Sequence, residues 1–180
     1  MTSVKGHWYV TPGYTDDAGY CITAVGLGEM QVALAKCQNW DIDTCMYATN
    51  TISCGTVRGF GGQELKSAMM PVINHMLADA NIDPVQFFHD NFVCAGDRYM
   101  WRDCNWWTCH EVDYRDAILS AAEAFGWKDK FKGWYKPTSV NGSKRIGVGV
   151  SIHGNGDVGE DNSEAIVRLH TNGSVILNQS

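Results

Sequence analysis

Apolar residues recur at intervals of three and four positions across residues 64–80, a pattern typical of a helix with one buried face. The residues that form this pattern are Leu65, Met69, Val72, Ile73, Met76 and Leu77. Pro71 lies within the segment, and because proline lacks a backbone donor we expect a kink or a restart there. A second helix is predicted to begin after Asp83, a typical N-cap, with Pro84 at its first position, and to end near Val93.

The same periodicity predicts a third helix over residues 113–125. Its apolar face consists of Ile118, Ala121, Ala122 and Phe125. Gly126 follows directly, and glycine is the residue that most often ends a helix. The third helix is therefore expected to end there.

The C-terminal part of the chain has the pattern of β-structure. Residues 145–152 alternate glycine or serine with valine and isoleucine, which predicts a strand closely approached by other backbone or by a ligand. Residues 165–169 and 174–177 are joined through Asn172-Gly173 and predict a β-hairpin. Residues 154–159 match the formula Gly-x-Gly-x-x-Gly, but a hairpin rather than a helix follows them, which argues against a dinucleotide-binding fold.

The N-terminal part has a weaker pattern. Residues 1–15 are expected to form an irregular lead-in, residues 18–25 a strand and residues 29–35 a helix. Residues 43–47 are expected to form a short strand. The elements together predict a mixed α/β chain of the α+β class. The sequence shows no linker that would divide it, so residues 1–180 are expected to form a single partial domain.

Charge and hydropathy exclude two classes of partner. The net charge is −6, and lysine and arginine are scattered, which argues against nucleic acid. No apolar run reaches the roughly 18–20 residues that a membrane helix needs, which argues against a membrane partner. The N-terminus lacks the apolar region of a secretory signal peptide. We therefore expect a cytoplasmic protein.

Cysteine and tryptophan are both frequent, with seven of each. The cysteines have irregular spacing and no Cys-x-x-Cys pair, which favours reduced thiols over a metal site. The nearest metal-like pattern, Cys104 to Cys109 and His110, is weak. Trp106 and Trp107, close to Trp101, are expected to pack in the core or at a subunit interface.

The segment Arg58–Gly62 is the main candidate for chemistry. A polar stretch leads into it, and the predicted helix follows at once. Glycines permit positive φ and a close approach of backbone to a ligand, while a helix N-terminus and an arginine both favour negative charge. The pattern therefore predicts a site for an anionic, oxygen-rich ligand.

This loop resembles the Arg-Gly-Phe-Gly-Gly loop of the molybdenum hydroxylases, the xanthine dehydrogenase and aldehyde oxidase family. Residues 84–97 are similar to the family's next helix and its closing Gly-Asp signature, and residues 145–180 are similar to the strand and hairpin that follow. Gln63 and Glu64 stand where many members of the family have Pro-Gln. The resemblance implies that this chain is a partial molybdopterin-binding large subunit.

The resemblance also assigns roles to residues. The residues that it implies for cofactor binding are Arg58, Gly59, Gly61 and Gly62. It implies that Phe60 packs against a flat substrate. Asn155 and Gly156 occupy the places of the family's substrate-facing aromatic residue and threonine, so the aromatic contact is lost there or the alignment is shifted by a few residues. His153 could replace that contact.

The implied activity is the hydroxylation of an aldehyde, a purine or another N-heterocyclic or aromatic substrate, with water as the oxygen source. The cofactor is molybdopterin carrying molybdenum, incompletely bound by this chain. Iron–sulfur clusters and FAD are expected on partner domains or subunits. The family's catalytic glutamate and a second cofactor loop have no counterpart in these residues, so the chain is expected to be inactive alone and to need other segments or subunits of the enzyme.

Two other interpretations remain open from the residues themselves. The chain could be a non-catalytic binding or assembly module whose glycine-rich loop holds an anion or a partner protein. It could instead be an enzyme of another class that uses the Arg58 loop for a phosphate or carboxylate ligand. Molybdenum in the native complex would separate the first interpretation from a molybdenum hydroxylase.

Overall fold

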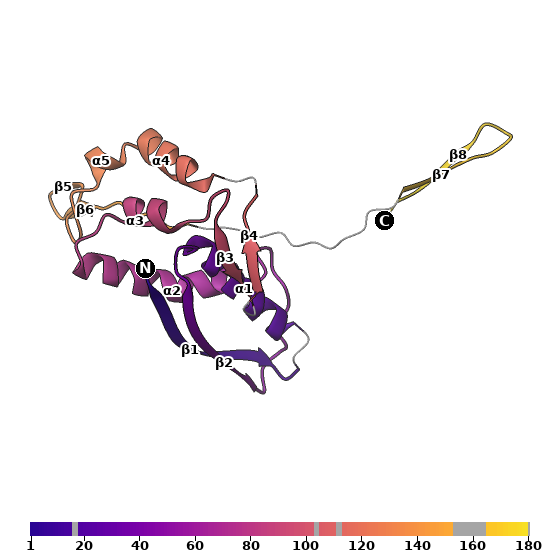
Figure 1. Cartoon of the computed structure of the whole chain (residues 1–180), viewed down its shortest axis with the longest axis horizontal. Coiled ribbons are helices and arrows are strands. Elements are labelled where there is room, and N and C mark those ends of the chain that lie inside the picture. Colours follow the sequence, from indigo (N-terminus) through magenta and orange to yellow (C-terminus); the bar gives the residue numbers. More distant parts are fainter. Residues whose placement is uncertain (16–17, 103–104, 111–112, 153–164, 180) are drawn as a thin grey trace.

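Helices α1 (Gly19–Ala33) and α2 (Gly62–Asp79) pack against each other in the larger part of the molecule (Figure 1). The structure is a computed structural model, and it describes residues 1–15, 18–102, 105–110, 113–152 and 165–179. The chain enters α1 from strand β1 (Ser3–Gly13) and leaves it through β2 (Asn39–Ala48). This β1–α1–β2 unit places the two strands in parallel.

The β1–β2 sheet has an inner and an outer face. Along β1, exposed and half-buried residues alternate from Ser3 to Val10, as the two-residue period of a strand requires. The outer face carries two polar pairs: Lys5 Nζ lies 2.5 Å from the Asp41 carboxylate, and His7 Nδ1 lies 3.3 Å from that of Asp43. The inner face therefore turns toward the helices, and the outer face toward solvent.

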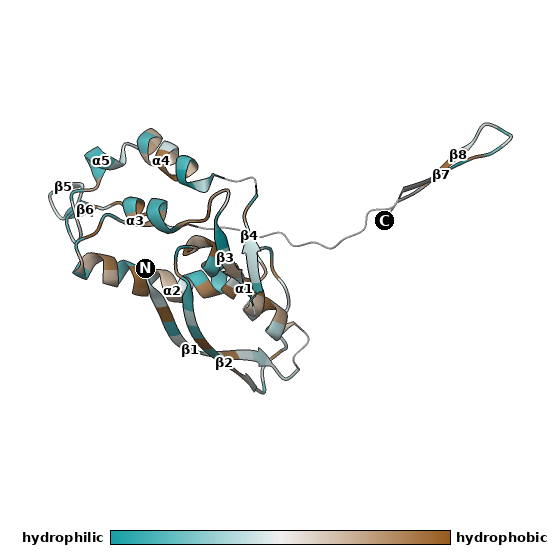
Figure 2. Cartoon of the chain, in the orientation of Figure 1, coloured by the Kyte–Doolittle hydropathy of each residue, from teal (hydrophilic) through white to brown (hydrophobic). Residues whose placement is uncertain are grey.

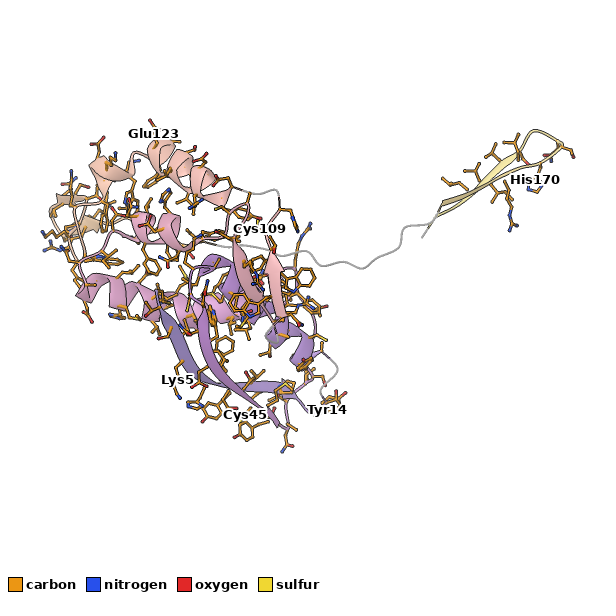
Figure 3. The ribbon with its side chains drawn as sticks, in the orientation of Figure 1. Lys5, Tyr14, Cys45, Cys109, Glu123 and His170 are labelled. Carbon is orange, nitrogen blue, oxygen red and sulfur yellow. The ribbon has the colours of Figure 1, made fainter. Side chains whose placement is uncertain are left out.

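The remaining elements follow α2 in chain order. They are α3 (Pro84–Asn91), β3 (Arg98–Trp101), β4 (Asn105–Thr108), α4 (Tyr114–Phe125), α5 (Trp127–Lys130), β5 (Ser139–Asn141), β6 (Lys144–Ile146), β7 (Ala165–Leu169) and β8 (Val175–Gln179). The pairs β3–β4, β5–β6 and β7–β8 are antiparallel hairpins. Figure 3 shows His170 on the last hairpin, away from Cys109, Lys5 and Glu123 in the larger part of the molecule.

The core lies where α1, α2, α3 and β3 meet. Its largest fully buried apolar side chains are Phe88, Phe92, Met30 and Leu34. Trp101 of β3 packs against Gly28 of α1, where an added Cβ would lie 2.9 Å from the indole ring. Much of the ribbon of α1 and α2 has the colour of apolar residues (Figure 2). No helix in the described part of the chain is long and apolar enough to cross a membrane.

Several sequence predictions are confirmed. Helix 64–80 corresponds to α2, and the Asp83 carboxylate caps α3 by accepting the backbone N–H of Val85 at 2.8 Å. The helix 113–125 corresponds to α4, whose C-cap Gly126 has φ of 74°. The β7–β8 hairpin and a strand over 43–47, within β2, are also as predicted. The mixed α+β class agrees with these elements.

Other predictions are wrong. The expected strand 18–25 lies in α1, and the expected irregular lead-in 1–15 contains β1. Helix α2 continues through Pro71, so of the two outcomes expected there, a kink or a restart, the restart does not occur. The strand expected over 145–152 ends at Ile146 with β6. For α1 the cause is physical: nine of its residues are buried, so it lacks the polar face that identifies a surface helix.

Candidate functional site

The segment Arg58–Gly62 forms two tight turns that lead into α2. The backbone N–H of Phe60 donates to the carbonyl of Val57 at 2.9 Å, and that of Gly62 donates to Gly59 at 2.9 Å. Gly59, Phe60 and Gly61 have φ of 103°, 44° and 99°, so glycine relieves the strain at two of the three positions. Arg58 is exposed and Phe60 is half-buried. The five residues therefore lie together in two successive turns.

The last two glycines of the loop face the protein's own helix α1. An added Cβ on Gly61 would lie 1.9 Å from the carbonyl oxygen of Ile22, and one on Gly62 would lie 1.6 Å from Glu29 Oε2. Gly26 of α1 also lies close to the loop, because its added Cβ would lie 2.6 Å from the Gly61 carbonyl oxygen. These contacts give a packing reason for Gly61 and Gly62, in addition to the ligand role that the sequence predicts for them.

A buried ion pair lies directly behind the loop. Lys66 Nζ and Glu29 Oε2 are 3.1 Å apart, and their side chains are 7% and 0% exposed. Burial lowers the pKa of Lys66, although the hydrogen bond from Lys66 to Glu29 and the charge of that carboxylate both act to raise it. The carboxylate also lies at the N-terminal end of α2, where the helix dipole favours negative charge.

A cavity of about 500 Å³ lies beside the loop, between β1 and the first turns of α1 and α2. Gly61, Cys54 and Gly55 form part of its wall, and Glu64 adds a polar group. An added Cβ on Gly55 would meet no atom within 4 Å, so the chain leaves open space next to this backbone. The loop borders this cavity at Gly61, whereas Arg58 is exposed and is not one of the residues that line it. A concave site of this size beside glycine backbone is a place where a small-molecule ligand can bind.

Asn155, Gly156 and His153, the substrate-side candidates, lie outside the described residues. Their predicted roles therefore stay predictions. In the described ranges, no group of three or more histidine, cysteine, aspartate or glutamate side chains is arranged to hold a metal ion. Cys21, Cys37, Cys45, Cys54, Cys94 and Cys109 are free thiols.

A second polar cluster joins the end of α1 to the start of α4. The Asp97 carboxylate accepts hydrogen bonds from Lys36 Nζ and, at 3.0 Å, from the backbone N–H of Cys94. Arg115 Nη2 donates to Cys94 Sγ, whose thiol lies 3.2 Å from Asp97. Burial acts to raise the pKa of Asp97, but the hydrogen bonds from Lys36 and Cys94 outweigh it and lower the pKa. Asp97 thus has a clear structural task in fixing the turn after α3.

Sequence reasoning missed Glu29, Lys66 and the cavity lining. A signal was present for both charges. Glu29 is an acidic residue in a long stretch rich in glycine and apolar side chains, and Lys66 precedes Met70, Ile73 and Leu77 at helical spacing. These four α2 residues form the buried face of the helix, whereas Val72 and Met76 of the predicted stripe are exposed.

One family model matches the chain. It describes the molybdopterin cofactor-binding domain and covers residues 1–92, which is half of the sequence and includes β1, α1, β2, the loop and α2. No curated protein matches the chain.

Proposed function

This chain belongs to the molybdopterin cofactor-binding domain family, and we propose that it forms part of the cofactor-binding subunit of a molybdenum hydroxylase similar to the xanthine dehydrogenases and aldehyde oxidases. Family membership supports a molybdopterin-binding role in a molybdenum oxidoreductase. The observation that carries the finer proposal is the loop Arg58–Gly62, which lies at the start of α2 beside an open cavity and within the matched residues.

Each residue of the loop has a part in this proposal. Arg58 supplies a fixed positive charge and a backbone turn at the cofactor, and Gly59, Gly61 and Gly62 keep the loop thin enough for close approach. Phe60 offers an aromatic face to a flat substrate. Asn155 and Gly156 are proposed to complete the substrate side. When bound, the molybdenum cofactor supplies the redox and oxygen-transfer chemistry, while the protein positions the reactants.

The proposal extends to partners and setting. The substrate would be an aldehyde, a purine or another N-heterocyclic or aromatic compound, with water as the source of oxygen. Iron–sulfur clusters and FAD would lie on partner domains or subunits. Residues 1–180 would contribute to the cofactor-binding domain and would act in the cytoplasm together with the other parts of the enzyme.

Metal and pterin analysis of the native complex tests this proposal. The chain is isolated from its host with the proteins that accompany it, and molybdenum, iron and oxidised-pterin fluorescence are measured. We expect stoichiometric molybdenum and pterin. Arg58→Ala should lower both, whereas the control Arg145→Ala, which removes an exposed arginine outside the matched residues, should not. An intact complex without molybdenum would overturn the proposal and favour the binding-module interpretation.

A further inference from the structure

The Glu29–Lys66 pair places two charges almost entirely out of contact with solvent. Their side chains are 0% and 7% exposed, and the charged atoms are 3.1 Å apart. Removing two ions from water is costly, and apolar side chains of similar size often serve stability as well or better. In some proteins a buried polar or ionic group of this kind fixes one arrangement of the chain against others.

The arrangement that this pair can fix is the junction between the loop and α2. Lys66 lies in the second turn of α2, and Glu29 reaches it from α1. The carboxylate passes so close to Gly62 that an added Cβ there would be 1.6 Å from Oε2. Glu29 therefore touches both the first residue of α2 and the lysine one turn later.

Helix α1 contacts the junction through three residues on one face. Ile22 and Gly26 are four positions apart and Glu29 is three further on, which is the spacing of neighbours on a helix surface. Ile22 and Gly26 meet Gly61, and Glu29 meets Gly62. The contacts at Gly61 are backbone to backbone and tolerate little displacement. The Glu29–Lys66 ion pair adds a polar contact with a defined direction between α1 and α2.

We propose that Glu29 and Lys66 act as positioning residues for the loop Arg58–Gly62, holding it in the conformation that receives the cofactor. The part of this proposal that concerns the cofactor rests on the proposed function. Burial lowers the pKa of Lys66, and the hydrogen bond to Glu29 and the charge of its carboxylate both act to raise it. The contact between these two buried charges joins α2 to α1 at this point.

The test compares a neutral double variant with a matched control. Glu29→Gln with Lys66→Met removes both charges and nearly preserves volume, so that no buried ion is left without its partner. The control is Lys5→Met with Asp41→Asn, which removes one charge of each sign from an exposed pair whose side chains are 71% and 69% exposed. Single variants are avoided because a lone buried charge would unfold the chain for unrelated reasons.

The first readout is amide hydrogen exchange in the complete chain without cofactor. We expect the double variant to exchange residues 58–64 about tenfold or more faster than the unchanged chain, while α3 keeps its protection. The control variant should exchange like the unchanged chain. Unaltered exchange at residues 58–64 in a folded double variant would overturn the proposal, since a purely structural pair replaced by packed neutral residues leaves the loop in place.

The second readout is molybdenum and pterin content of the native complex. We expect a several-fold loss in the double variant and none in the control. A double variant with fast-exchanging loop amides but full cofactor content would overturn the link to the cofactor. A complex of unchanged chain without molybdenum would instead overturn the proposed function, and the exchange experiment would still decide whether the pair positions the loop.

Discussion

Helices α1 and α4 differ sharply in burial although both have helical length and apolar residues. Of the fifteen residues of α1, nine are buried, and the helix contacts α2, β1 and β3. None of the twelve residues described in α4 is buried, and that helix packs against α3 and α5 (Figure 1). The proposed cofactor loop is thus attached to a helix that is largely buried, whereas α4 lies at the surface.

The two helices also use small residues differently. Gly26 and Gly28 of α1 admit the Gly61 backbone and the Trp101 ring, respectively, at distances that a Cβ would block. The alanines of α4 lie toward a groove of about 380 Å³ shared with Phe92 and Val150, which leaves the apolar face of α4 only partly covered. Close packing in α1 and loose packing in α4 predict different responses to the same kind of mutation.

The largest expected contrast is between truncations of large apolar side chains. Met30 in α1 is 0% exposed, and Leu119 in α4 is 42% exposed. Met30→Ala should lower the free energy of unfolding by about 2–5 kcal/mol, since it removes buried contacts and leaves a cavity. Leu119→Ala should change it by no more than about 0.5 kcal/mol. Urea unfolding followed by tryptophan fluorescence measures both, and equal losses would contradict the comparison.

The next contrast concerns glycine and alanine. Ala is favoured over Gly in a helix by about 1 kcal/mol, so Ala121→Gly in α4 should destabilise by about that amount. In α1 glycine is expected to be favoured over alanine instead. Gly26→Ala places a methyl group 2.6 Å from the Gly61 carbonyl oxygen, and an overpacking cost of about 1–3 kcal/mol should exceed the gain in helix propensity. A stabilised Gly26→Ala variant would show that α1 and the loop are not in close contact in solution.

The difference in packing between α1 and the other helices explains which elements the sequence could predict. Helices α2 and α4 have polar and apolar faces, so their periodicity identified them. Helix α1 is rich in glycine because other backbone approaches it, and the same glycines with β-forming neighbours suggested a strand. The loop Arg58–Gly62 was evident from its composition. The pairing of Glu29 with Lys66 was not evident, because the two residues lie 37 positions apart and only the fold brings them together.

A smaller effect concerns the polar cluster that ties α1 to α4. Burial opposes ionisation of Asp97, but hydrogen bonds from Lys36 and Cys94 lower its pKa below the ordinary value. The unfolded chain therefore binds the proton more readily than the folded one. The contribution of ionised Asp97 to the stability of the fold is complete above about pH 4, the pKa of the carboxyl group in the unfolded chain. It is lost as the pH falls through the lower pKa of the folded chain.

Substitution of Asp97 tests this linkage. Asp97→Asn should cost about 1 kcal/mol at pH 7, because the amide cannot replace the charged acceptor for Lys36. The cost should shrink as the pH falls below 4, where the unchanged chain loses the same interaction. Urea unfolding at pH 7 and at pH 3 measures the two differences. An equal cost at both values would show that Asp97 does not ionise with a lowered pKa.

The smallest effect is expected at the β7–β8 hairpin, where one face carries large apolar residues that are more exposed than those of α4. Val167, Leu169, Val175 and Leu177 share one face of the hairpin by their register, and all are 58% exposed or more. A lone two-stranded hairpin is at best marginally stable in water, so this apolar face contributes little until another layer covers it.

Leu169→Ser should therefore change the free energy of unfolding by less than about 0.5 kcal/mol in the complete chain. The matched substitution Leu34→Ser, at a side chain that is 0% exposed, should be strongly destabilising. A comparable loss at both leucines would mean that the hairpin packs on the larger part of the molecule, and the contrast between a closely packed α1 region and an uncovered C-terminal region would fail.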